Sequence, residues 1–175
     1  MTVLAILRWP SDRLRDVSEP VTDEELHSEA LRTLVRDMHE TMLARKGAGI
    51  AAVQVGVPKR LFLKLHDDSL IDPPTSIAFV NPVLVSASVE RETEEEGCLS
   101  VSGVSLPVER AKSVVLHALD LDGKKFTTEA MGTYARVLQH EMDHLGGKCI
   151  PDGLSQAQRD MMRRKLKSRK WTRRR

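Results

Sequence analysis

The chain has 175 residues, of which 41% are hydrophobic and 30% are charged, a composition that suits one globular domain with a substantial core. No apolar run approaches the roughly 20 residues of a membrane-spanning helix, and the first residues lack the basic leader and long apolar stretch of a secretory signal. Two cysteines, Cys98 and Cys149, are too few for a disulfide framework, and the net charge of +2 hides an acidic body with a basic end. We therefore expect a cytoplasmic protein with reduced thiols and no membrane association.

The first element that the sequence predicts is a helix near the amino terminus. Thr22 and Glu25 have the spacing of a capping box, which marks a helix start. Apolar residues then recur at helical spacing, so the helix should run from about Asp23 into the forties. The glycines Gly47 and Gly49 are expected to end it.

Short runs of apolar and β-branched residues follow and predict strands. They lie at Leu61–Leu65, Ile77–Val85 and Ser113–Ala118. Asp122 followed by Gly123 is a hairpin-turn signal, which joins the last of these strands to a returning strand near Lys125–Thr128.

Two further helices are predicted in the second half of the chain. One should occupy about Met131–Leu145 and end at Gly146 and Gly147, where glycine tolerates the left-handed conformation of a helix cap. The other should begin at Ser155, which has a capping-box partner at Gln158. Strands around a central helix indicate an α+β fold with mainly antiparallel sheets.

The sequence contains no internal repeat or low-complexity linker, so we predict one catalytic domain, residues 1–153, followed by a basic helix or tail, residues 154–175. Ten of the 27 basic residues but one of the 25 acidic residues fall between Arg159 and Arg175, which leaves a net charge of −7 on the rest. A basic segment of this kind is typical of a chain that binds a polyanion, of which RNA is the leading candidate. A solvated helix end that keeps the protein soluble would give the same pattern, so both interpretations remain open.

The most informative stretch is QHEMDHL, residues 139–145, within the second predicted helix. His140 and His144 stand four residues apart and therefore share one helix face, where two imidazoles can hold a first-row metal ion. Glu141 is placed to act as a general base, as in zinc hydrolases. The alternative is a pair of surface histidines on an ordinary amphipathic helix.

The third metal ligand is predicted upstream of this helix. No histidine or glutamate in a recognised pattern follows His144, and Asp152 and Asp160 fit no known arrangement. Cys98, in the segment EGCLS at residues 96–100, offers a thiolate that with two imidazoles leaves a fourth tetrahedral position for water, as catalytic sites require. Taken alone, Cys98 would be interpreted as a small buried hydrophobic residue.

Three segments in the same order together resemble the peptide deformylase family. They are GAGIAAVQ at residues 47–54, EGCLS at 96–100 and QHEMDHLGG at 139–147, and the resemblance extends over nearly the whole chain. It implies antiparallel β-sheets packed around the HExxH helix, with an N-terminal helix and a C-terminal basic helix.

The resemblance also implies the ligand set and the reaction. Cys98, His140 and His144 would hold one divalent metal ion per chain, natively Fe(II), although zinc, nickel or cobalt suits the same ligands. The substrate would be the N-formylmethionine of nascent polypeptides, from which hydrolysis releases formate. Metal-bound water would attack the formyl carbonyl, with Glu141 as general base and then general acid.

Further roles follow from the same motifs. The resemblance gives the side-chain amide of Gln54 and the backbone N–H of Leu99 as donors to the oxyanion. Gly47 and Gly49 would let a substrate strand approach closely, although they would equally well end the first helix. Val137 lies on the same helix face as the metal ligands and is expected either to line the methionine pocket or to belong to the core.

Three positions, Ala48, Ser102 and Ser105, depart from what many members of this family carry. Ser105 stands where the family frequently has a basic residue, and Ala48 replaces a bulkier side chain. These departures leave open a second hypothesis, a deformylase-like paralogue that acts on another amide or formyl group. Arg136 is also notable, since a buried arginine needs a partner, which we expect among Glu94–Glu96.

The basic end suggests a partner as well as a substrate. An enzyme of nascent chains gains from binding near the ribosomal exit, and some members of the family dock there through their carboxy-terminal helix. The residues from Arg159 onward therefore predict affinity for the ribosome or rRNA that weakens with salt. A third hypothesis, a non-catalytic RNA-binding protein with a structural metal, would normally need four protein ligands, and the sequence provides three.

Overall fold

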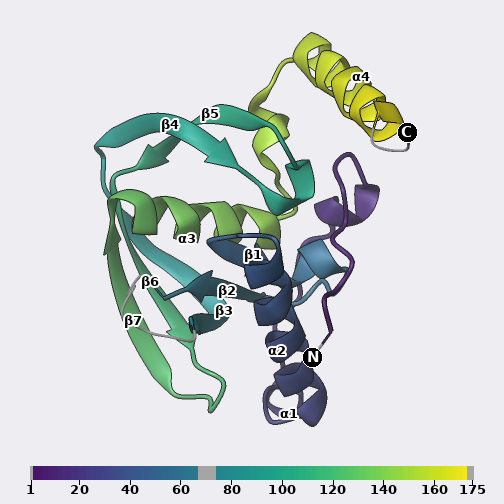
Figure 1. Ribbon diagram of the computed structural model, residues 1–175. Coiled ribbons are helices and arrows are strands. Elements are labelled where there is room, and N and C mark those ends of the chain that lie inside the picture. Colours follow the sequence, from purple (N-terminus) through teal and green to yellow (C-terminus); the bar gives the residue numbers. More distant parts are fainter. Residues whose placement is uncertain (1, 67–73, 173–175) are drawn as a thin grey trace.

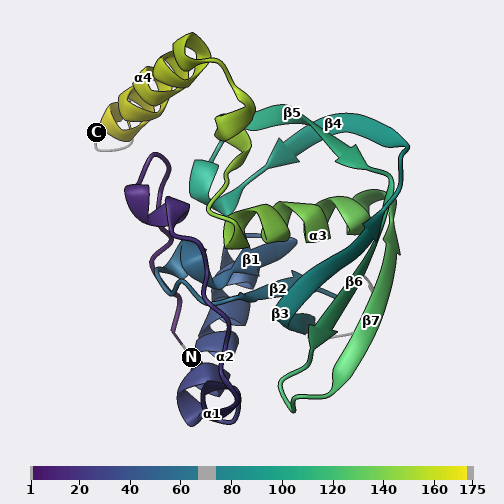
Figure 2. The same cartoon turned by 180° about the vertical axis from the view of Figure 1, so that it is seen from behind.

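The computed structural model describes residues 2–66 and 74–172 (Figure 1). At the centre of the protein, helix α3 (Gly132–Leu145) lies between a five-stranded sheet and a separate pair of strands, β4 (Arg91–Gly97) and β5 (Ser105–Ala111). Seen from behind, β4 and β5 arch over one side of α3 while the larger sheet lies on the other (Figure 2). The predicted α+β class, with antiparallel sheets around a central helix, is confirmed.

The predicted N-terminal helix is divided into two. α1 (Asp23–Leu26) is a single turn that starts with the predicted capping box, in which Thr22 and Glu25 exchange hydrogen bonds of 2.9 and 3.2 Å. α2 (Glu29–Ala44) begins after Ser28, whose hydroxyl accepts a hydrogen bond from the backbone amide three residues on. The prediction of one continuous helix is therefore wrong, because Ser28 caps a second helix start.

The five-stranded sheet is antiparallel throughout and has the strand order β1-β2-β3-β6-β7. Its strands are β1 (Gly49–Ala51), β2 (Leu61–Leu65), β3 (Ser76–Ala87), β6 (Ser113–Leu119) and β7 (Lys125–Met131). The strands predicted from the apolar runs and the hairpin turn are confirmed. The sequence gives no signal for β1, because this edge strand is only three residues long and begins with glycine.

The two-stranded sheet is also absent from the sequence-based prediction. β4 reads RETEEEG, and Glu96 is its one buried residue. Charged residues are poor strand formers by themselves, so β4 depends on its seven paired positions with β5 and on contacts with the rest of the fold. This pair of strands closes over the face of α3 that the large sheet leaves uncovered.

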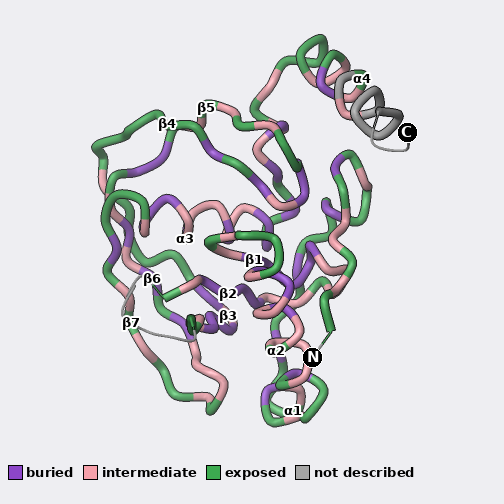
Figure 3. The backbone as a smooth tube through the Cα atoms, viewed as in Figure 1, coloured by how far each residue is buried: buried purple, intermediate pink, exposed green. Residues whose placement is uncertain are grey.

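The main apolar core lies between α3 and the large sheet, where buried residues gather (Figure 3). Ala135, Leu138 and Leu145 of α3 are fully buried there. Phe62 and Phe79 from neighbouring strands stack below them with ring centroids 4.7 Å apart. Because each large buried side chain stabilises the fold by about 1.5–3 kcal/mol, this face fixes the position of α3 firmly.

The end of α3 is held by the N-terminal segment of the chain. The backbone amide of Ser18 donates to the carbonyl of Leu145 at 2.9 Å. Gly147 then turns the chain with a φ of +71°, where a β-carbon would lie 2.4 Å from the carbonyl oxygen of Arg15. The predicted helix end at Gly146 and Gly147 is confirmed, and Gly147 is needed both for its φ and for space.

The C-terminal helix α4 (Gln156–Thr172) packs onto the N-terminal segment. Its predicted capping box is present, since Ser155 and Gln158 exchange hydrogen bonds of 2.8 and 3.3 Å. Met162 is buried in an apolar cluster with Trp9. Neither α4 nor any other helix of the described residues is long and apolar enough to cross a membrane.

Replacing Gly147 by alanine should destabilise the fold. The new β-carbon would be strained at this φ and would collide with Arg15, so we expect the free energy of unfolding to fall by at least about 2 kcal/mol. Gly153→Ala is the matched control, because nothing lies within 4 Å of the β-carbon that it adds. That variant should change the same free energy by less than about 0.5 kcal/mol in urea unfolding. Equal stability of the two variants would contradict the argument.

Candidate metal centre and active site

Two secondary-structure elements bring the three predicted metal ligands together. His140 and His144 project from one face of α3, with ring centroids 4.9 Å apart. Cys98 follows β4 directly, and its Sγ lies 3.3 Å from Nε2 of His144. One donor atom from each of the three residues lies within 4.8 Å of the other two. The structure therefore brings Cys98 together with two histidines that lie more than forty residues farther along the sequence.

The chemistry and burial of this group fit a first-row divalent metal ion. Cys98 is 9% exposed and His144 is 1% exposed, so the donors are shielded from bulk water. One thiolate and two imidazoles suit several such ions, and three ligands leave a tetrahedral position open. The group found among the described residues provides three protein ligands. Catalytic metal sites normally have three protein ligands, whereas closed structural sites have four.

A buried carboxylate orients the first histidine. Oε2 of Glu96 accepts a hydrogen bond from Nδ1 of His140 at 2.9 Å, so we assign the proton to that nitrogen and leave Nε2 for the metal. Arg110 binds both oxygens of Glu96 at 2.9 and 3.0 Å, and Arg136 donates to Oε1 at 2.8 Å. Burial by itself raises the pKa of Glu96, but the hydrogen bonds from His140 and Arg110 outweigh it and lower the pKa to about 2. Glu96 is therefore a fixed negative charge.

Arg136 has the partners that were expected for it. Its Nε lies 2.9 Å from a carboxylate oxygen of Glu94, and its Nη1 contacts Glu96 at 2.8 Å. Two backbone carbonyls, those of Glu92 and Val108, accept its remaining hydrogen bonds. The prediction that Arg136 pairs with an acid among residues 94–96 is confirmed, and the pairing connects α3 to both β4 and β5.

The second histidine is held as a neutral ring. Burial is the largest cause that lowers the pKa of His144 well below its usual value, and the charge of Arg110 adds to the effect. Its Nδ1 lies 3.8 Å from Sγ of Cys149, and burial raises the pKa of that thiol to about 12. A neutral imidazole is the form that can donate an electron pair to a metal ion.

Glu141 is a buried acid directed toward the cavity beside this group. It is 3% exposed, and burial raises its pKa to about 7. Its Oε2 has no hydrogen-bond partner among the described residues. Gly49 packs against its other oxygen so closely that a β-carbon there would lie 2.5 Å from Oε1. A carboxylate with these properties can accept and return a proton near neutral pH.

The two predicted hydrogen-bond donors also lie at the metal centre. Oε1 of Gln54 accepts a hydrogen bond from the backbone amide of Ala51 at 2.8 Å, which fixes the direction of the side-chain amide. Its Nε2 therefore points toward Sγ of Cys98 at 3.6 Å and the hydroxyl of Ser100 at 3.1 Å. Leu99 follows Cys98 at the start of a short 3-10 helix, Leu99–Val101.

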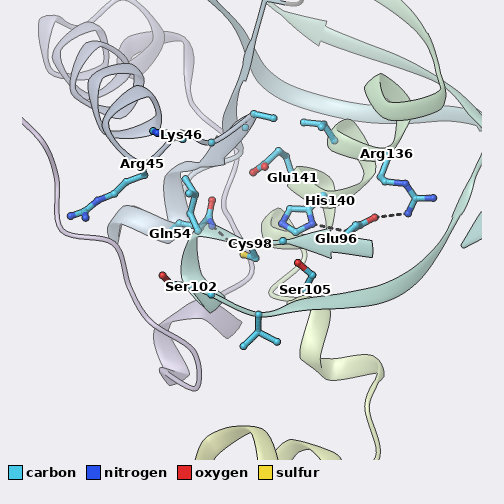
Figure 4. Close-up of a pocket in the computed structure, with 18 of the residues that line it drawn as sticks. Arg45, Lys46, Gln54, Glu96, Cys98, Ser102, Ser105, Arg136, His140 and Glu141 are labelled. Carbon is cyan, nitrogen blue, oxygen red and sulfur yellow. Dashed lines mark hydrogen bonds and ion pairs between the residues drawn. The ribbon is translucent and has the colours of Figure 1, made fainter. Parts of the chain in front are cut away.

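A cavity of about 750 Å³ opens in front of these residues (Figure 4). Its lining includes the predicted substrate contacts Gly47, Gly49 and Val137. Val137 is half-buried and borders the cavity. The structure thus brings all the predicted catalytic, substrate-binding and metal-ligating residues together at one cavity and the adjoining metal-ligating group.

Two residues of the site could not be found from the sequence. Arg110 lies in the unpredicted strand β5 and contacts both Glu96 and Asp143, but no local pattern marks it as buried. Ser100 accepts the hydrogen bond from Gln54, and only its place in EGCLS could have drawn attention to it.

Comparisons with known proteins agree with one another. The family model for polypeptide deformylase matches residues 3–160. A peptide deformylase of Azotobacter vinelandii is 42% identical over 166 residues, which cover 95% of each chain. The crystal structure of a peptide deformylase from Legionella pneumophila is 41% identical with a TM-score of 0.88, and the match covers 99% of each chain. A Met-Ala-Ser-bound peptide deformylase from Acinetobacter baumannii is 36% identical with a TM-score of 0.79, covering 87% of this chain and 99% of that one.

Removing the charge of Glu96 should weaken both the fold and the metal centre. Glu96→Gln leaves Arg110 and Arg136 buried without their shared carboxylate, so we expect a loss of about 3–5 kcal/mol in the free energy of unfolding. Metal affinity should fall about 10- to 100-fold, since His140 loses its charged partner. Glu94→Gln is the control, because Glu94 is 47% exposed and its ion pair is worth at most about 1 kcal/mol. Urea unfolding and metal titration test both variants, and similar behaviour of the two would exclude this role for Glu96.

Proposed function

Because the chain belongs to the polypeptide deformylase family, we propose that it hydrolyses the N-formyl group of formylmethionine at the start of nascent polypeptides and releases formate. The observation that carries the mechanism is the buried carboxylate of Glu141. One of its oxygens lacks a hydrogen-bond partner among the described residues, and the side chain borders both the cavity and the Cys/His/His group. An unpaired buried carboxylate costs free energy, and it is useful where a proton must be accepted.

The cofactor is proposed from the ligand set. A divalent ion held by Cys98, His140 and His144 would act as a Lewis acid that polarises the formyl carbonyl and activates water. We propose Fe(II) as the native ion, with zinc, nickel or cobalt able to occupy the same ligands.

The groups around this centre would transfer the proton and stabilise the oxyanion. Glu141 accepts a proton from the attacking water and then delivers it to the departing amine, for which a pKa of about 7 is suitable. Nε2 of Gln54 and the backbone N–H of Leu99 donate hydrogen bonds to the oxyanion that forms on the formyl oxygen. Gln54 is preorganised for this task, because Ala51 and Ser100 hold its amide in one orientation before substrate binds.

The peptide is proposed to bind as an added strand along β1. This strand stands at the edge of the large sheet, so its outer backbone groups have no neighbouring strand among the described residues. Gly47 and Gly49 have no side chains to obstruct a peptide there. Val137 borders the same cavity, where a methionine side chain would enter beside Ala48. The relative from Acinetobacter baumannii with Met-Ala-Ser bound supports a peptide of this composition.

The C-terminal part is proposed to bind the ribosome. Residues 1–153 would form the catalytic domain, and residues 154–175 a basic helix or tail that contacts rRNA. Arg159 and Arg163 are only partly buried in α4, and Arg164 is exposed, while Met162 anchors the helix to the body of the protein. A cationic helix that is anchored at one end is a suitable electrostatic contact with RNA phosphates.

Replacing Glu141 should abolish most of the activity. We expect Glu141→Gln to lower kcat for formate release from formyl-Met-Ala-Ser by about 100- to 10,000-fold, since general acid–base catalysis contributes that much. Metal content must be measured in parallel, and the exposed Glu129→Gln is the control that should retain full activity. No formate release from the metal-loaded unmodified protein would instead favour the paralogue with another amide or formyl substrate.

Shortening the tail should weaken binding to ribosomes without affecting chemistry. Deleting residues 167–175 removes six of the ten basic residues and retains Met162 and Leu166, which pack in the cluster with Trp9. We expect less co-sedimentation with ribosomes and a weaker dependence on salt, while formate release from a free tripeptide is unchanged. Undiminished co-sedimentation would rule out this role for the tail.

A further inference from the structure

The cavity has an uneven charge at its rim. Arg45 and Lys46 lie at the end of α2 and line the cavity with exposed side chains. Neither forms an ion pair within the part of the chain that the structure describes, whereas Arg136 on the other side is neutralised by Glu94 and Glu96. Figure 4 shows Arg45 and Lys46 on one side of the metal-ligating residues and Arg136 on the other.

The segment after Cys98 contributes no basic residue of its own to the cavity lining. Ser102 and Ser105 line it with hydroxyl groups, and Glu95 is the exposed acid of the lining. Arg8 adds a further exposed cation, whose Nη1 donates to the carbonyl of Leu99 at 3.3 Å. The exposed cations of the rim are therefore Arg45 and Lys46, where α2 ends and β1 begins, and Arg8 beside Leu99.

The backbone of Lys46 is an independent sign that this side chain has a role. Lys46 has a φ of +55°, in the left-handed region, immediately after the last residues of α2. Glycine is the residue most often found at this position of a helix end, because a β-carbon is disfavoured there. A cation near a helix C-terminus interacts favourably with the helix dipole, but that interaction does not require a lysine at the left-handed position itself. Strained residues of this kind are concentrated at functional sites.

The short connection between α2 and β1 limits the distance between this charge and the reacting end. Gly49 lies against Glu141 at the reacting end, and Lys46 precedes it by three residues, in the turn between α2 and β1. The three residues from Lys46 to Gly49 span at most about 10 Å, the length of three extended residues at roughly 3.3 Å each. A peptide bound along β1 with its formyl group at Glu141 therefore reaches Lys46 with about its third or fourth residue.

We propose that Arg45 and Lys46 form a specificity site that favours acidic side chains at about the third and fourth residues of the formylated peptide. The inference rests on the proposed deformylase function and concerns the preference for substrates, not the chemical step. The two cations would attract a carboxylate of the substrate, and Lys46 would repel a lysine or arginine at the same place. Because the site is exposed, the preference should weaken as salt is added.

The test compares three amidated peptides, formyl-Met-Ala-Glu-Glu, formyl-Met-Ala-Gln-Gln and formyl-Met-Ala-Lys-Lys. In low salt we expect kcat/KM for the acidic peptide to exceed that for the basic peptide by about three- to tenfold, mainly through KM. Lys46→Gly combined with Arg45→Gln should bring this ratio close to one, and Lys46→Glu combined with Arg45→Glu should invert it. Lys46→Gly also removes the unfavourable backbone strain, so loss of folding is not expected to obscure the result.

The control variant and the neutral peptide separate the possible failures. Lys124→Gln removes an exposed cation in the β6–β7 turn and should leave the ratio as in the unmodified protein. If the unmodified protein releases no formate from the neutral peptide, the proposed function fails. If it cleaves all three peptides equally well in low salt, the specificity site is refuted while the function stands. An equal reduction for all three peptides in the Lys46 variants would likewise refute a role for its charge.

Discussion

One buried carboxylate connects the elements that form the site. Glu96 lies in β4, binds Arg110 of β5, and binds Arg136 and His140 of α3. Charges of this kind are costly to bury, and the cost is offset only when every oxygen and nitrogen is satisfied. The network meets that condition because Asp143, Glu94 and two backbone carbonyls accept the hydrogen bonds of the arginines that Glu96 does not. The position of Cys98, two residues after Glu96, depends on the same contacts.

The two faces of α3 are held by different forces. Toward the large sheet the helix buries Leu138 and Leu145 against stacked aromatic rings, an attachment that is strong but not directional. Toward β4 and β5 it uses charged hydrogen bonds, which have strict geometry. A metal centre needs donor atoms at fixed distances, and the directional face is the one that carries His140. The apolar face provides the stability that permits a polar network to be buried on the other side.

The sequence predicted the site better than it predicted the fold around it. Spacing alone indicated that His140 and His144 share a helix face. Cys98 is far from them in the sequence, so its place beside them was identified only from the motifs. The strands that could be predicted are those with apolar alternation or a hairpin turn. β4 and β5 could not, because residues such as Glu94 are exposed and their strand conformation depends on tertiary pairing. The break at Ser28 shows a local capping preference that helical periodicity does not reveal.

The missing side chain at Gly49 has a consequence for the range of sequences that can be accommodated. At the reacting end, a bound chain would meet only main-chain groups of β1, and every polypeptide presents the same amides and carbonyls. In the proposed binding mode, tolerance of different substrate sequences and closeness to Glu141 would have a common physical origin, since one absent β-carbon permits both. Beyond the residue whose side chain enters the cavity beside Val137, discrimination between sequences would begin farther out, where Lys46 and its neighbours have side chains.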